Sequence, residues 1–121
     1  MILNKRFRFE AAHLLPHHQG VCSRLHGHSY GLRVSVETDI DPATGMGCDF
    51  AELDGAVREQ VLGRLDHRNL NDLLDNPTAE AICQWMWEQL APAVPGRLVE
   101  IELHETEECS CTYRGPGSGR T

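Results

Sequence analysis

Two stretches near the start of the chain alternate between apolar and polar residues, which is the period of two expected of a half-buried β-strand. The first stretch covers residues 3–15, and its apolar face carries Phe7, Phe9, Ala11 and His13. The second covers residues 26–39, and its apolar face carries Leu32, Val34 and Val36. If the two stretches pair across the loop that joins them, they form an antiparallel hairpin.

Two later stretches place apolar residues at the three- and four-residue spacing of amphipathic helices. Asp49 begins the first helix, and Glu52 three residues later predicts a capping box. The apolar stripe of this helix ends at Leu65. Thr78 is the expected N-cap of the second helix, whose apolar stripe ends at Leu90.

Alternation returns over residues 97–105 and 109–114, which predicts a third and a fourth strand. Val99, Ile101 and Leu103 lie on one face of the third strand. The order strand, strand, helix, helix, strand, strand predicts an α+β fold, with a four-stranded antiparallel sheet and two helices on one of its faces.

Composition narrows the class of protein. Hydrophobic residues make up 40% and charged residues 24% of 121 residues, and residues 1–115 read as one globular domain with a flexible tail at 116–121. The formal net charge of −7 argues against a nucleic-acid partner. No apolar run approaches a membrane span and no signal peptide is recognisable, so we expect no membrane partner and a cytoplasmic location. The five cysteines are then expected to be reduced.

Five of the seven histidines fall between residues 13 and 28. His26 and His28 are two residues apart, so on a strand both face the apolar side. His13 lies on the apolar face of the first strand, and a hairpin would bring it close to the other two. Three imidazoles with one open position are typical of a catalytic zinc site. The alternative is three separate polar residues near a loop.

Three further positions could take part in chemistry, and each has a second interpretation. Cys22 could be a fourth ligand that closes a structural metal site, or a reactive thiolate near the metal. Asp66 and His67 could be a helix-terminal polar pair or a carboxylate-supported histidine for acid–base work. Glu105 could be a strand-end residue, or it could bind a guanidine-like edge of a ligand. Spacing alone does not decide between these alternatives.

Six segments occur in an order that resembles the 6-pyruvoyltetrahydropterin synthase superfamily, over residues 5–115. They are Phe9–His13, Cys22–His28, Asp41–Met46, Leu65–His67, Asn76–Glu80 and His104–Thr106 with Tyr113–Gly115. Three residues separate Cys22 from His26, which resembles the carboxytetrahydropterin type of the queuosine pathway more than the pyruvoyl type.

The resemblance implies a role for each candidate residue. His13, His26 and His28 would bind Zn²⁺, and Cys22 would be a proton-accepting thiolate and not a ligand. Asp66 and His67 would form a proton relay, to which Glu105 also belongs. Glu105 would anchor the pterin ring, with Thr106 beside it. The resemblance names no residue for the triphosphate, and Arg24 and Lys5 are candidates chosen only for their positive charge.

The resemblance also implies a reaction and an assembly. The substrate would be 7,8-dihydroneopterin triphosphate, and the products 6-carboxy-5,6,7,8-tetrahydropterin, acetaldehyde and triphosphate, in a carbon–carbon lyase reaction. The implied tunnelling fold joins the sheets of neighbouring subunits into a barrel, usually in a homohexamer with active sites at the interfaces. Two alternatives are a 6-pyruvoyltetrahydropterin synthase, which eliminates triphosphate, and a non-catalytic zinc-binding module closed by Cys22.

Overall fold

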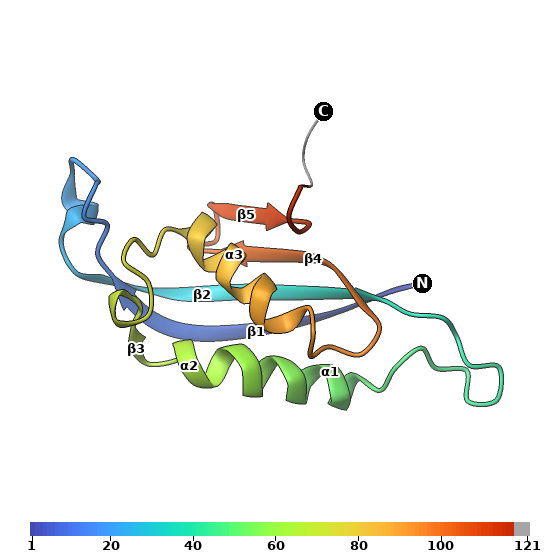
Figure 1. The fold of residues 1–121 in the computed structure, drawn as a ribbon. Helices are drawn as coiled ribbons and strands as arrows, with labels where there is room; N and C mark the ends of the chain where they lie inside the picture. The colour runs from blue at the N-terminus through green and yellow to red at the C-terminus, as the bar shows by residue number, and fades with distance from the viewer. Residues whose placement is uncertain (118–121) are drawn as a thin grey trace.

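A computed structural model describes residues 1–117, so most of the predicted tail lies outside the described residues. Five strands make one sheet: β1 (Ile2–His13), β2 (His26–Glu37), β3 (Arg68–Asn69), β4 (Arg97–His104) and β5 (Ser110–Tyr113). The four strands predicted from alternation are confirmed, with ends that differ by one or two residues. The long β1–β2 hairpin runs the full length of the sheet (Figure 1).

The prediction of four antiparallel strands is wrong in one respect, because the sheet is mixed and has five strands. Its order is β3-β1-β2-β4-β5, and β3 pairs in parallel with β1 through Ala11↔Arg68 and Ala12↔Asn69. A strand of two residues is too short to show alternation, so the sequence gives no signal for it. This short pairing matters for function because it fixes the segment that carries Asp66 and His67 to the edge of β1.

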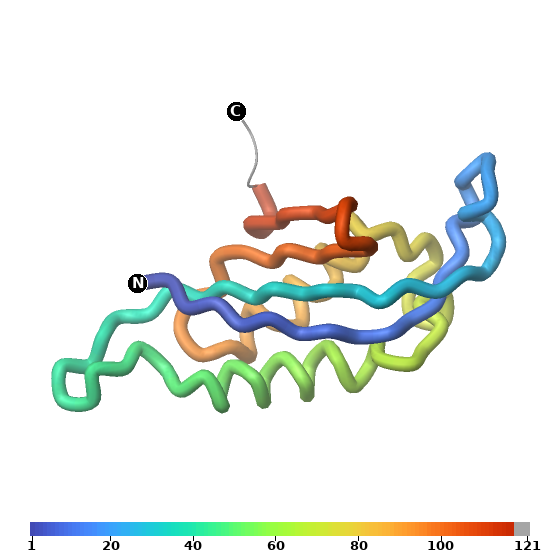
Figure 2. Tube along the Cα trace, turned by 180° about the vertical axis from the view of Figure 1, so that it is seen from behind, coloured from blue at the N-terminus to red at the C-terminus, as the bar shows by residue number. Residues whose placement is uncertain are grey.

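Both helical segments cover the same face of the sheet, as the two opposite views show (Figures 1 and 2). The first comprises α1 (Phe50–Val57), a π-helical turn η2 (Arg58–Leu62) and α2 (Gly63–Leu65). The second is α3 (Ala79–Leu90). The predicted caps are confirmed: Asp49 and Glu52 form a capping box, and the Thr78 hydroxyl accepts the N–H of Ala81 at 3.1 Å. None of the helices within residues 1–117 is long and apolar enough to cross a membrane.

A β-bulge in β4 changes which residue of that strand enters the core. Val34 pairs with Ile101, but Val36 pairs with Leu98, so Val99 is an extra residue on the β4 side. Leu98 is therefore buried and Val99 is only half-buried, contrary to the alternation predicted from sequence. A bulge shifts the faces of a strand by one residue. The faces of Ile101 and Leu103 are unaffected, and both side chains are fully buried.

The core lies between the sheet and the helices, and it holds β1 and β2 in a fixed register. The predicted apolar faces of both strands are buried there, from Phe7, Phe9 and Ala11 on β1 to Leu32, Val34 and Val36 on β2. Each of these Phe, Leu and Val side chains contributes roughly 1.5–3 kcal/mol on burial. The register also places the end of β1 beside the start of β2, at the end of the sheet nearest the connecting loop.

Candidate metal centre and active site

Three histidines converge where β1 ends and β2 begins. The register pairs His13 with His26 and Ala11 with His28, so all three imidazoles share the helix-covered face. Their possible ligand nitrogens lie within 4.8 Å of one another, and their ring centroids are 4.6, 5.1 and 4.9 Å apart. The strand register thus confirms the prediction that the three histidines lie on one face of the hairpin.

Backbone carbonyl groups hold two of these rings by their Nδ1 atoms. The His13 Nδ1–H donates to the Pro77 carbonyl oxygen at 2.7 Å, and the His26 Nδ1–H donates to the Arg24 carbonyl oxygen at 2.7 Å. A carbonyl oxygen can only accept, so Nδ1 carries a proton in each ring and Nε2 is the nitrogen left to bind a metal. Metal-binding histidines commonly have this arrangement, because it fixes both tautomer and orientation.

The residues present fit a metal ion. The Nε2 atoms of His13 and His28 are buried and have no hydrogen-bond partner within the described residues. A buried polar atom without a partner costs about 1–3 kcal/mol. Three convergent imidazoles, two of them with a buried Nε2 that has no hydrogen-bond partner within residues 1–117, offer the ligand set that zinc and similar divalent metals take in an open site.

Tyr30 is part of this centre and is not singled out by the sequence. Its ring stacks on Phe9, with centroids 4.8 Å apart, and meets the rings of His13 and His28 edge to face. Its hydroxyl lies 3.4 Å from His13 Nδ1, and burial raises the pKa of this phenol. The available signal was its position two residues after His28, which puts it on the same face.

Glu105 lies beside the histidines, just past the end of β4. Its Oε1 is 3.5 Å from His28 Nε2, and its side chain is 26% exposed. Burial lowers the pKa of His28 and so favours the neutral ligand form, while the Glu105 carboxylate opposes that shift. The carboxylate thus borders the histidine cluster and remains reachable by a ligand. Thr106, by contrast, uses its hydroxyl to accept the N–H of Cys109 at 3.1 Å within the following turn.

Cys22 lies in the loop before the histidines, on the short helix η1 (Val21–Ser23), and is half-buried. The compact cluster of possible ligand atoms in residues 1–117 contains the three histidines and does not include its thiol. Arg24 follows η1 with an exposed side chain. Lys5 lies elsewhere, 3.4 Å from Asp54, and so already has an acidic partner.

Asp66 and His67 form a pair on the outer edge of β1. An oxygen of Asp66 accepts the Glu10 N–H at 2.9 Å and lies 3.1 Å from His67 Nδ1; the Glu10 N–H, and then His67, lower the pKa of Asp66. His67 adopts a left-handed backbone (φ 59°), a conformation that costs roughly 1–3 kcal/mol for a residue with a side chain.

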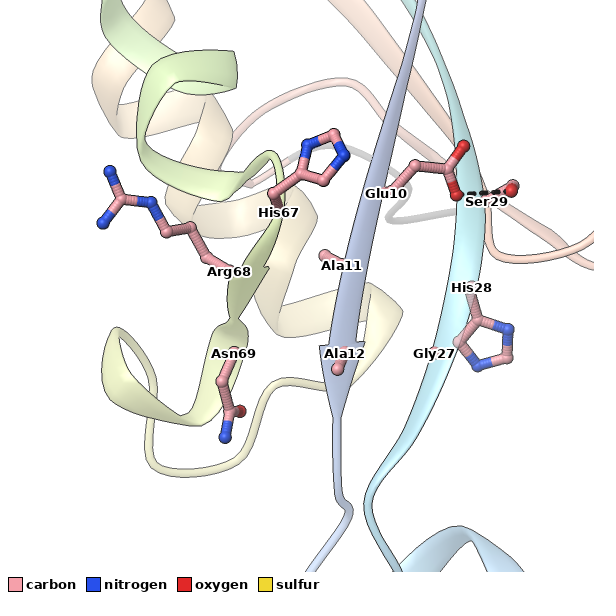
Figure 3. Close-up of a pocket in the computed structure, with 9 residues that line it drawn as sticks. All are labelled: Glu10, Ala11, Ala12, Gly27, His28, Ser29, His67, Arg68 and Asn69. Atoms are coloured by element: carbon pink, nitrogen blue, oxygen red, sulfur yellow. Dashed lines mark hydrogen bonds between the residues drawn. The ribbon is translucent and has the colours of Figure 1, made fainter.

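The pair is not joined to the histidine cluster within this chain. The side chain of His67 is 79% exposed. Figure 3 shows it on one side of β1, with His28 on the far side, on β2. Both residues line a pocket of about 560 Å³. No hydrogen bond or ion pair in residues 1–117 connects His67 with the three histidines. Within the described part of one chain the Asp66–His67 pair is therefore not bonded to the histidine cluster, although His67 and His28 line the same pocket.

The sequence pattern described as 6-pyruvoyl tetrahydropterin synthase matches residues 2–116. The chain belongs to the 6-pyruvoyl tetrahydropterin synthase family. It is 45% identical to the 6-carboxy-5,6,7,8-tetrahydropterin synthase of Synechocystis sp., over 95% of this chain and 94% of that protein. It is 39% identical to the dihydroneopterin monophosphate aldolase of Pyrococcus furiosus, over 85% and 88% of the two chains.

The fold agrees with this membership. The Caenorhabditis elegans 6-pyruvoyl tetrahydropterin synthase structure matches with a TM-score of 0.85 and 29% identity, over 95% of each chain. Members of the family with these names differ in the reaction that they catalyse. Membership therefore indicates a pterin-processing enzyme.

Proposed function

We propose that this protein converts 7,8-dihydroneopterin triphosphate to 6-carboxy-5,6,7,8-tetrahydropterin, acetaldehyde and triphosphate, as a zinc-dependent lyase of queuosine biosynthesis. The observation that carries the proposal is the cluster of His13, His26 and His28, whose possible ligand nitrogens lie within 4.8 Å of one another, with Glu105 beside His28. The 45% identity to a 6-carboxy-5,6,7,8-tetrahydropterin synthase over nearly the whole chain supports this choice of reaction.

His13, His26 and His28 are the proposed zinc ligands. The bound Zn²⁺ would polarise the hydroxyl groups of the substrate's side chain and acidify the adjacent C–H bonds. Cys22 is the proposed base, because its thiol lies outside the ligand cluster on the neighbouring loop. A thiolate near a cation has a lowered pKa and can accept a proton at neutral pH.

Glu105 is the proposed anchor for the pterin. A carboxylate can accept two N–H groups of an aminopyrimidine edge at once, as it does with a guanidinium group. Its position beside His28 would orient the side chain of the substrate toward the histidines. Thr106 and Arg24 remain the proposed partners of the rest of the substrate. Arg24 follows Cys22 on the same loop, and its carbonyl oxygen already positions His26.

The relay pair, Asp66 and His67, is proposed to act in the active site of a neighbouring copy. His67 is exposed and held in a strained backbone conformation by the β3–β1 pairing, which suits a side chain that acts on another molecule. Asp66 lies beside Nδ1 of the ring and would stabilise its protonated form. Cys22 of one copy and His67 of the next would then move protons between the side chain and the ring of the pterin. This arrangement requires a homo-oligomer, which we propose to be a hexamer whose sheets join into a barrel.

Product analysis tests the proposal. Zinc-loaded protein is incubated with 7,8-dihydroneopterin triphosphate, the pterin is identified by mass, and acetaldehyde is assayed separately. The proposal predicts 6-carboxytetrahydropterin together with acetaldehyde. A 6-pyruvoyltetrahydropterin product without acetaldehyde would assign the chain to the other branch of its family. An unchanged substrate would favour a non-catalytic zinc-binding module.

A further inference from the structure

The face of the sheet that the helices leave uncovered borders a pocket of about 670 Å³ lined by four arginines, three from β1 and β2 and one, Arg58, from η2. We call it the arginine pocket, and its basic residues are Arg6, Arg8, Arg33, Arg58 and His104. A sheet face open to solvent ordinarily carries polar residues, and opposite charges on neighbouring strands stabilise it whereas like charges destabilise it. A local excess of arginine is unexpected in a chain of net charge −7.

The floor of the arginine pocket is made by a glycine. The sheet register places Arg8 opposite Gly31 and Gly31 opposite His104, so the three residues form one row across β1, β2 and β4. Gly31 has no side chain, and an added Cβ would come within 3.5 Å of the His104 Cβ. The hollow between Arg8 and His104 therefore exists because the middle residue of the row is glycine.

Two of the arginines form ion pairs and, within the described part of the chain, two do not. Arg33 binds Glu100 at 2.7 Å and Glu102 at 2.9 Å, and Arg58 binds Asp54 at 2.9 Å. Arg6 and Arg8 have no acidic partner within 4.0 Å among residues 1–117, and their side chains are exposed on the same face of β1. Like charges on adjacent positions of one strand face repel each other. Arg6 and Arg8 therefore form a locally positive pair in which neither guanidinium has a direct acidic partner among residues 1–117.

We propose that the arginine pocket binds an anion with several phosphate charges, at a site distinct from the histidine cluster. Guanidinium groups recognise phosphate oxygens in a bidentate manner, and Arg6 and Arg8 can each supply one such contact. Two carboxylates also line the pocket: Glu107, and Glu102, which is bound by Arg33 and His104. Their negative charge opposes that of an incoming anion, so a singly charged anion gains little net attraction there. An oligophosphate overcomes this opposition because it carries three or more negative charges.

Calorimetric titration of the zinc-loaded protein with inorganic triphosphate tests this site without any turnover. The choice of probe follows the proposed reaction, which releases triphosphate, but binding itself does not depend on that reaction. Arg8→Gln and Arg6→Gln are each expected to weaken triphosphate binding by about tenfold or more, since a charge-assisted contact is lost. Orthophosphate should bind far more weakly than triphosphate. Raising the salt concentration should weaken binding of triphosphate, because the contacts are exposed.

Arg64→Gln is the matched control. It removes the same charge from helix α2, where Arg64 contacts Gln89 and the Trp85 ring. Its triphosphate affinity should equal that of the unaltered protein, and the zinc content and melting temperature of all three variants should be unchanged. Titration with GTP tests whether the pocket also binds a triphosphate group that is part of a larger molecule. Competition between GTP and triphosphate indicates that the site accepts the arm as well.

Three results would overturn the proposal. The first is triphosphate affinity that is unchanged in both Arg6→Gln and Arg8→Gln. The second is loss of affinity in Arg24→Gln alone, which would place the anion at the histidine cluster. The third is a change of oligomeric state in Arg8→Gln without any triphosphate binding to the unaltered protein, which would assign these arginines to contacts between copies. All three results can be measured even if the protein does not catalyse the proposed reaction, because the titration involves no turnover.

Discussion

His13 donates its Nδ1–H to the carbonyl oxygen of Pro77 at 2.7 Å, and this bond links the end of β1 to the residue before the N-cap of α3. The two residues are 64 positions apart in the chain. The bond points the other nitrogen of the ring toward His26 and His28. The geometry of the proposed metal centre thus depends on how α3 packs on the sheet, as well as on the β1–β2 register.

The metal centre is expected to bind about one zinc per chain, as three-histidine sites do. His26→Ala should lose most of the metal, because two imidazoles hold zinc far more weakly than three. His17→Ala is the control, since His17 is exposed on the same loop outside the cluster. Elemental analysis after dialysis measures both. Stoichiometric zinc in a variant that lacks all three histidines would contradict the assignment.

Glu105→Gln is expected to weaken pterin binding by about tenfold, because an amide offers one acceptor where a carboxylate offers two. Zinc content should stay the same, since Glu105 lies 3.5 Å from His28 and is not one of the clustered ligands. Fluorescence titration with a non-reacting pterin measures the affinity. Equal affinity in the variant and the unaltered protein would remove Glu105 from the pterin site.

The separation of His67 from the histidine cluster predicts complementation between two inactive variants. Cys22→Ala and His67→Ala should each be inactive alone. If each active site takes Cys22 from one copy and His67 from another, mixed oligomers contain some sites with both residues. Dissociation and reassembly of a one-to-one mixture should then restore part of the activity, with each variant reassembled alone as the control. No recovery in verified mixed oligomers would mean that both residues act within one chain.

Glu102 is expected to contribute to the loss of folding stability at acid pH. A hydrogen bond with His104, and then one from Arg33, holds the pKa of Glu102 below its ordinary value of 4.5. A lowered folded-state pKa gives stability above the unfolded pKa, and that stability is lost as pH falls through the folded value. Glu102→Gln should therefore flatten the loss of stability below about pH 4.5, by about 1 kcal/mol or less because the side chain is 25% exposed.

Denaturant unfolding at several pH values measures this effect, and Glu59→Gln is the control, since Glu59 is exposed and makes no ion pair within residues 1–117. If the free energy of unfolding falls equally steeply below about pH 4.5 in Glu102→Gln and in the unaltered protein, the prediction is wrong.

Alternation of apolar and polar residues was enough to predict the four longer strands and the face that carries His13, His26 and His28. It could not predict β3, whose two residues pair in parallel with β1 only after the chain has folded. It also placed Val99 in the core, because a bulge leaves no mark in the pattern of a single strand. Strand faces follow from local periodicity, whereas bulges and short parallel pairings depend on tertiary contacts.

The candidate site was predictable to the extent that it uses unusual residues in a dense cluster. Tyr30 was missed because a tyrosine on an apolar strand face reads as core, although its ring contacts two of the histidines. The arginine pocket was missed because its net charge depends on which arginines form ion pairs in the folded chain. The sequence does not show that Arg33 is paired with Glu100 and Glu102 while Arg8 has no such partner among residues 1–117.

The claim that the histidine centre is catalytic and open, and not structural and closed, is tested most directly by zinc content and turnover in Cys22→Ala. A catalytic thiolate outside the ligand set predicts that the variant keeps about one zinc per chain and its melting temperature, while product formation from 7,8-dihydroneopterin triphosphate is lost. A fourth ligand predicts that zinc and stability fall together, because metal binding is coupled to folding. A zinc-depleted, destabilised Cys22→Ala protein would contradict the account.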